Sequence, residues 1–152
     1  MDRADWARVE AAVVAETGTL PDGTVEGVGI EGWQKLLDLI RVRGWPSEFQ
    51  VDGRVCPLPL AAETLFPPDT LATVAVWISP GIRINVFPYG VEDICFDFDT
   101  REIAGGGLQV VGEFSRDVGR FLERKVRLAH EGDGTGVFLT YDPAADTFAS
   151  PP

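Results

Sequence analysis

Three short segments of alternating apolar residues, separated only by tight turns, constrain the fold of this chain most strongly. They cover residues 71–78, 82–87 and 92–99, and the turns between them are Ser79-Pro80-Gly81 and Pro88-Tyr89-Gly90. Alternation with a period of two is typical of strands, and Gly and Pro are common turn residues. Because connections this short join antiparallel neighbours, the pattern predicts a three-stranded antiparallel meander.

Helical periodicity flanks the meander on both sides, with apolar residues recurring every three to four positions. The predicted helices are 2–16, 31–43 and 108–124. Asp52-Gly53 is a typical hairpin turn, so two short paired strands are expected around it. The other expected elements are this hairpin over 47–57, a short helical turn over 61–66, and strands at 126–130, 136–141 and 147–149.

The segment TGTLPDGT, residues 17–24, is rich in turn-forming residues, and we expect a turn there instead of a strand. That expectation bears on Gly27-x-Gly29-x-x-Gly32, which has the glycine spacing of a dinucleotide-binding loop. Such a loop must follow a buried parallel strand, so that a pyrophosphate can approach the backbone at the start of a helix. Residues 17–26 are not expected to supply one, which favours a plain loop leading into a helix.

The order of the elements predicts the α+β class. We expect an antiparallel sheet, a meander of about three central strands plus flanking hairpins, with two N-terminal helices and one later amphipathic helix packed on one face. The length of 152 residues fits a single domain over 1–152.

The charge of the chain is strongly negative. Asp and Glu number 24 against 13 Lys and Arg, for a formal net charge of −11. Such a chain is repelled by nucleic-acid phosphates and by anionic membrane surfaces, and it attracts basic proteins. We therefore expect no nucleic-acid or membrane partner. Acidity that serves only solubility is the alternative.

Cysteine usage and the N-terminal sequence favour a cytoplasmic location of the bacterial type. Cys56 and Cys95 are far apart and are expected to be reduced thiols. The first residues, MDRADWARVEAA, lack the apolar core of a secretory signal. No apolar run reaches the roughly 18 residues needed to span a bilayer.

The strand ending in Asp97-Phe98-Asp99 resembles the nucleophile strand of haloacid-dehalogenase-like phosphatases. In that family the first Asp attacks phosphorus, the second acts as acid and base, and Mg²⁺ assists. The family pattern has Thr or Val two residues after the second Asp, where this chain has Arg101. Plain strand alternation also accounts for the pattern, so neither a metal nor another cofactor is expected.

Two further features favour structural roles. His130 is the only histidine, and without a nucleophile signature elsewhere it is expected to be a solvated loop residue. Arg116, Arg120 and Arg124 are spaced along one side of the last helix and are expected to form a solvated face with local ion pairs.

The outward side of the meander is the predicted binding surface. If Val74, Val76, Ile84 and Val86 face the core, residues of the opposite parity face away. Aromatic and Arg side chains are favoured anchors at interfaces, and carboxylates would meet a basic partner. The alternative is that another segment, such as 57–69, covers them. The predicted binding residues are Trp77, Arg83, Asn85, Phe87, Asp93, Asp97 and Asp99.

Three function classes follow. The favoured one is a protein-binding module without catalytic residues. In size, acidity and expected fold class the chain is similar in general character to immunity proteins of bacterial toxin systems, a likeness that carries no residue over. The second is a carboxylate-based, metal-assisted hydrolase in which Asp97 and Asp99 share one strand face. The third is a homo-oligomer, such as a homodimer, that buries the exposed aromatics.

Overall fold

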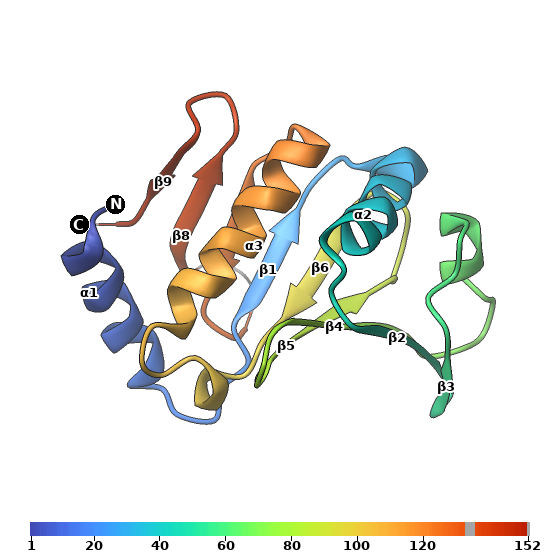
Figure 1. The fold of residues 1–152 in the computed structure, drawn as a ribbon, viewed down its shortest axis with the longest axis horizontal. Helices are drawn as coiled ribbons and strands as arrows, with labels where there is room; N and C mark the ends of the chain where they lie inside the picture. Colours follow the sequence, from blue (N-terminus) through green and yellow to red (C-terminus); the bar gives the residue numbers. More distant parts are fainter. Residues whose placement is uncertain (133–135, 152) are drawn as a thin grey trace.

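The computed structural model describes residues 1–132 and 136–151. Figure 1 shows one broad sheet with helices lying over it. The helices are α1 (Arg3–Val14), α2 (Gly29–Arg43) and α3 (Gly107–Leu122), with short 3-10 helices η1 (Ala62–Leu65) and η2 (Thr100–Glu102). The strands are β1 (Asp22–Val25), β2 (Ser47–Val51), β3 (Arg54–Cys56), β4 (Ala72–Ser79), β5 (Ile82–Phe87), β6 (Ile94–Asp97), β7 (Val126–Ala129), β8 (Val137–Asp142) and β9 (Thr147–Ala149).

All nine strands belong to one antiparallel sheet, in the order β3-β2-β4-β5-β6-β1-β7-β8-β9. This confirms the prediction of an α+β fold with an antiparallel sheet, and β4, β5 and β6 are consecutive neighbours as the meander requires. The sheet has more strands than the predicted three central strands and flanking hairpins suggest. The meander supplies the third to fifth strands of a continuous nine-stranded sheet whose middle strand is β6.

The prediction of a turn over 17–24 was wrong for its second half, because Asp22–Val25 form strand β1. This strand lies between β6 and β7 and pairs with both. Its backbone groups therefore gain partners on two sides, which outweighs the weak strand preference of Asp and Gly. Since β1 is antiparallel to both neighbours, the Gly27–Gly32 loop still lacks the parallel strand that a dinucleotide site needs.

The helices pack against the same side of the sheet. Figure 1 shows α2 and α3 crossing it and α1 at the margin beside β8 and β9. Trp6 of α1 contacts Phe148 of β9, with ring centroids 5.0 Å apart, and lies over Gly112 of α3. The core between the layers includes Trp33, Leu37 and Ile40 of α2, Val111, Phe114 and Val118 of α3, and Val74, Val76, Ile84, Val86, Ile94 and Phe96 of the sheet.

Side chains from distant segments complete helix α3. Its first turn has no side-chain cap of its own, and the Glu10 carboxylate accepts hydrogen bonds from the Gly106 and Leu108 backbone N–H groups. A carboxylate at this end also complements the helix dipole. Arg120 forms an ion pair with Asp146, and Arg124 donates to the Gly27 carbonyl. Arg120 and Arg124 are exposed, as expected of a solvated face, but their partners are distant in sequence and not local.

No helix within residues 1–132 and 136–151 combines the length and the apolar character that crossing a membrane would require.

Candidate functional site

The second side of the sheet carries no helix in the described part of the chain (Figure 1). Along β5 every second side chain is buried against the helices, and those between are half-buried and face outward. We call this outward side the open face. Its half-buried members on β1, β2, β4, β5 and β6 are Asp22, Thr24, Glu48, Gln50, Thr73, Trp77, Arg83, Asn85, Phe87, Cys95 and Asp97. Ala75 of β4, the cross-strand partner of Asn85, lies on the same side and is fully buried.

Five of the seven predicted binding residues lie on the open face, namely Trp77, Arg83, Asn85, Phe87 and Asp97. The expectation that the segment 57–69 covers them was wrong. That segment lies against helix α2, where Gln34 donates to the Leu60 carbonyl and Arg41 to the Leu58 carbonyl.

The other two predicted residues have local structural roles. Asp93 precedes β6 and accepts a hydrogen bond from the Gly27 backbone N–H at 2.9 Å. Asp99 follows β6, caps η2 and forms an ion pair with Arg101 at 2.6 Å. The Arg101 hydrogen bonds lower the pKa of Asp99. The expected pairing of Asp97 with Asp99 on one strand face is therefore wrong, because the strand ends at Asp97.

The carboxylate that lies beside Asp97 is that of Asp22, whereas the sequence suggested Asp99. Asp22 and Asp97 are direct cross-strand partners in β1 and β6. Such partners project to the same side, with Cβ atoms about 4.5–5.5 Å apart. Asp22 was missed because its segment was expected to be a turn, and no local sequence signal places it beside Asp97.

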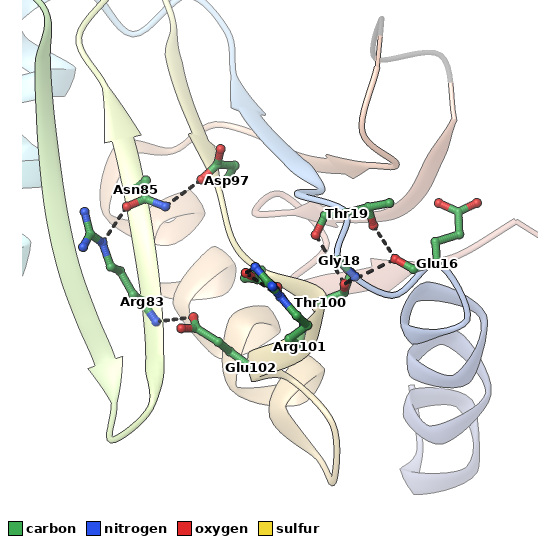
Figure 2. Close-up of polar contacts among 10 residues, drawn as sticks. Glu16, Gly18, Thr19, Arg83, Asn85, Asp97, Thr100, Arg101 and Glu102 are labelled. Atoms are coloured by element: carbon green, nitrogen blue, oxygen red, sulfur yellow. Dashed lines mark hydrogen bonds and ion pairs between the residues drawn. The ribbon is translucent and has the colours of Figure 1, made fainter.

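Asp97 is held by a line of polar contacts along the open face (Figure 2). The Asn85 amide donates to Asp97 at 2.8 Å, and the Arg83 guanidinium donates to the Asn85 oxygen at 2.6 Å. Arg83 also lies over the Trp77 ring, 5.4 Å from its centroid. Asn85 therefore presents its amide nitrogen to Asp97 because Arg83 occupies its oxygen, which fixes the orientation of the carboxylate.

Both carboxylates resist ionisation. Burial raises the pKa of Asp22, and the negative charge of Glu131 raises it further. Burial is also the largest cause that raises the pKa of Asp97, followed by the charges of Asp22 and Glu131. Among the ion pairs of the described residues, none joins Asp22 or Asp97 to a Lys or Arg. The two carboxylates therefore lack an ion-pair partner among the described residues, although the Asn85 hydrogen bond and the charge of Arg83 lower the pKa of Asp97.

Asp22→Asn is expected to stabilise the protein near neutral pH by about 0.5 kcal/mol, because it removes a like charge from a direct cross-strand pair. A raised folded-state pKa means that the ionised form destabilises the fold. The gain should shrink as the pH falls through that raised pKa, and vanish below the ordinary value of 3.8. Urea unfolding of both proteins from neutral pH to about pH 3 measures this. A gain that persists in acid contradicts it, and Asp38→Asn on α2 is the control.

Cys95 and His130 do not join this pair in a catalytic set. Burial raises the pKa of the Cys95 thiol, and the charges of Asp93 and Asp22 raise it further, which opposes the thiolate form. His130 lies 3.4 Å from Glu16 and packs on Phe138. Within the described residues, no group of three or more His, Cys, Asp or Glu side chains has the geometry to hold a metal ion. Residues 133–135 of the loop after His130 lie outside the described residues.

The open face can recognise a ligand through its charged groups and its aromatic side chains. It offers desolvated carboxylates as acceptors and aromatic rings as contact area, and its strands hold both rigidly. In comparisons with known proteins, no family model, no curated protein and no solved structure matches the chain.

Proposed function

We propose that this chain is an acidic protein-binding module that docks a basic protein on its open face. The observation that carries the proposal is the uncovered sheet side itself. An antiparallel sheet with one solvated face normally presents polar residues there. This face instead combines Trp77 and Phe87 with Asp22 and Asp97, neither of which has an ion-pair partner among the described residues.

The charge of the whole chain supports a basic partner. A net charge of −11 steers positively charged proteins toward the molecule and accelerates their association. At contact, the aromatic side chains contribute buried area and the carboxylates contribute charge-assisted hydrogen bonds. We expect the association rate to fall with added salt and the dissociation rate to depend on the aromatics.

In its most concrete form, the proposal is a cytoplasmic antidote, or immunity protein, for a basic bacterial toxin. Such a protein needs a rigid, acidic surface that occupies a basic active site and needs no catalytic group of its own. The open face and the acidity of the chain support this form of the proposal.

A hydrolase that uses two carboxylates is the second candidate, favoured by the Asp22–Asp97 pair. Two neighbouring carboxyl groups with raised pKa values can divide the roles of acid and base. This candidate predicts that a substrate is turned over and that Asp97→Asn abolishes turnover. A homodimer through the open face is the third arrangement, and light scattering of the purified chain at twice its mass would support it.

The proposal is tested by differential capture. Immobilised wild-type protein, Phe87→Ala and Phe121→Ala are exposed to an extract of the cells that naturally express the chain. Phe87 is on the open face, whereas Phe121 is an exposed Phe on α3, so it serves as a matched control. We expect a basic protein to be retained by wild type and Phe121→Ala, to be lost with Phe87→Ala, and to elute with salt.

The captured protein is then purified and titrated against the same variants. Removing an aromatic anchor is expected to weaken binding by at least about tenfold. Equal affinity for all three proteins would exclude the open face as the docking surface. A partner that is itself acidic would exclude the electrostatic part of the proposal.

A further inference from the structure

A shallow pocket lies on the open face where β1 and β6 meet the turn after β5. Its volume is about 370 Å³. The side chains that matter for its chemistry are Asp22, Thr24, Phe87, Tyr89, Cys95 and Asp97. One side is acidic and the other is aromatic, so the pocket has two chemically distinct walls.

Among the described residues, no Lys or Arg forms an ion pair with the acidic wall. The charge of Arg83 lowers the pKa of Asp97, but its guanidinium donates to Asn85 and lies over Trp77. Arg127, the cross-strand partner of Thr24, forms an ion pair with Glu26. The residues outside the description are Asp133, Gly134, Thr135 and Pro152, none of which carries a positive side chain. Two carboxylates placed directly opposite each other without a cation destabilise a sheet. A local arrangement that opposes stability is characteristic of a binding site.

The aromatic wall is a stacked pair. The rings of Phe87 and Tyr89 lie 5.4 Å apart with an interplanar angle of only 6°. Tyr89 is 78% exposed, although large aromatic residues are usually covered. Burial and then the charges of Asp97, Cys95 and Asp22 raise the pKa of the Tyr89 hydroxyl, as expected for a ring beside the carboxylates. A flat, exposed π-face next to two carboxylates suits a cationic group.

We infer that this pocket receives an arginine side chain of the docked protein, with the guanidinium bound by Asp22 and Asp97 and stacked on the aromatic pair of Phe87 and Tyr89. The inference rests on the proposed docking function and names its central contact. Arginine fits better than lysine, because its planar group donates two parallel hydrogen bonds to carboxylates and stacks on aromatic rings. Asn85 and Arg83 act as positioning residues that orient Asp97.

The inference is tested on the purified protein with three fluorescein-labelled probes: hexa-arginine, hexa-lysine and the uncharged hexa-citrulline. Affinity is measured by fluorescence anisotropy at physiological ionic strength. The test variant is Asp22→Asn/Asp97→Asn. The matched control is Asp38→Asn/Glu113→Gln, which removes the same charge from exposed positions on α2 and α3. The nonspecific attraction of a cationic probe to the acidic protein therefore changes equally in both double variants.

We expect hexa-arginine to bind more tightly than hexa-lysine and citrulline to bind least. The Asp22/Asp97 variant should bind hexa-arginine about tenfold more weakly, because charged hydrogen bonds are lost, while the control should change by less than about twofold.

Equal weakening in both double variants, or equal affinity for hexa-citrulline, would each overturn the inference. None of these results would refute docking on the open face, since Phe87→Ala and Phe121→Ala test that separately with the captured partner. The converse result is that the docking test fails while the Asp22/Asp97 variant still loses affinity for hexa-arginine. That result would leave an arginine-binding site whose natural ligand is not a protein surface.

Discussion

Gly23→Ala is expected to lower the free energy of unfolding by about 2 kcal/mol, although Ala prefers strands at least as well as Gly does. Gly23 of β1 lies directly opposite Phe96 of β6 on the core side. A Cβ added there would be 2.0 Å from Cζ of the Phe96 ring, which is far inside van der Waals contact. That ring is buried and packs edge-to-face on Phe114, so it has little room to move.

Urea unfolding measures the effect, with Thr24→Ala as a control on the same strand but on the open face. The clash also predicts that Phe96→Leu costs less in the Gly23→Ala background than in wild type. We expect a coupling of at least about 1 kcal/mol between the two positions. Additive effects would show that the ring does not lie over Gly23.

Thr100→Val is expected to lower the free energy of unfolding by about 1 kcal/mol, because the Gly18 N–H loses its acceptor and two carbonyls lose a hydroxyl contact. Thr100 is 2% exposed. Figure 2 shows its hydroxyl beneath the chain that leads into β1. The hydroxyl accepts from the Gly18 backbone N–H at 3.0 Å and lies 3.3 Å from the carbonyls of Glu16 and Thr19. Val has nearly the same shape and can satisfy none of these groups.

Thr100→Ser retains the hydroxyl and should lose less than half as much stability, which separates the hydrogen bonds from the packing of the methyl group. Amide exchange supplies a second measurement. We expect the Gly18 amide to exchange faster in Thr100→Val than in Thr100→Ser. Equal stability of the Val and Ser variants would show that the hydroxyl contacts contribute nothing.

These two predictions concern the same element, because Gly23 and Thr100 both hold β1 in the sheet. β1 in turn places Asp22 beside Asp97. Either substitution should therefore weaken the binding of hexa-arginine more than its loss of global stability explains. The candidate site is thus coupled to the position of β1 in the sheet.

Part of the candidate site could be predicted from the sequence. Strand periodicity placed Trp77, Arg83, Asn85 and Phe87 on the side opposite the buried Val and Ile residues, since side chains in a strand alternate between faces. The same reasoning placed Asp97 correctly. It extended the strand too far at both ends, so Asp93 and Asp99 were grouped with Asp97 although they serve as loop and cap acceptors.

The helix predictions failed where burial depends on distant partners. Phe121 follows the buried Val118 at helical spacing, yet it is 39% exposed, while Ser115 is buried and donates to the Val111 carbonyl. The arginine stripe was expected to pair within its own helix, and Arg120 instead pairs with Asp146, which follows β8. Periodicity gives the direction of a side chain but not the segment that it meets.

The sequence alone determined the antiparallel meander, the three helices and the acidity of the chain, because short turns, helical spacing and net charge are local or additive properties. The tertiary structure alone decided that Asp22–Val25 form a strand, that this strand lies between β6 and β7, and that Asp22 therefore meets Asp97. The physical reason is that two flanking strands can supply backbone hydrogen bonds to a segment whose own residues favour turns. A contact between residues 22 and 97 exists only once that register is formed.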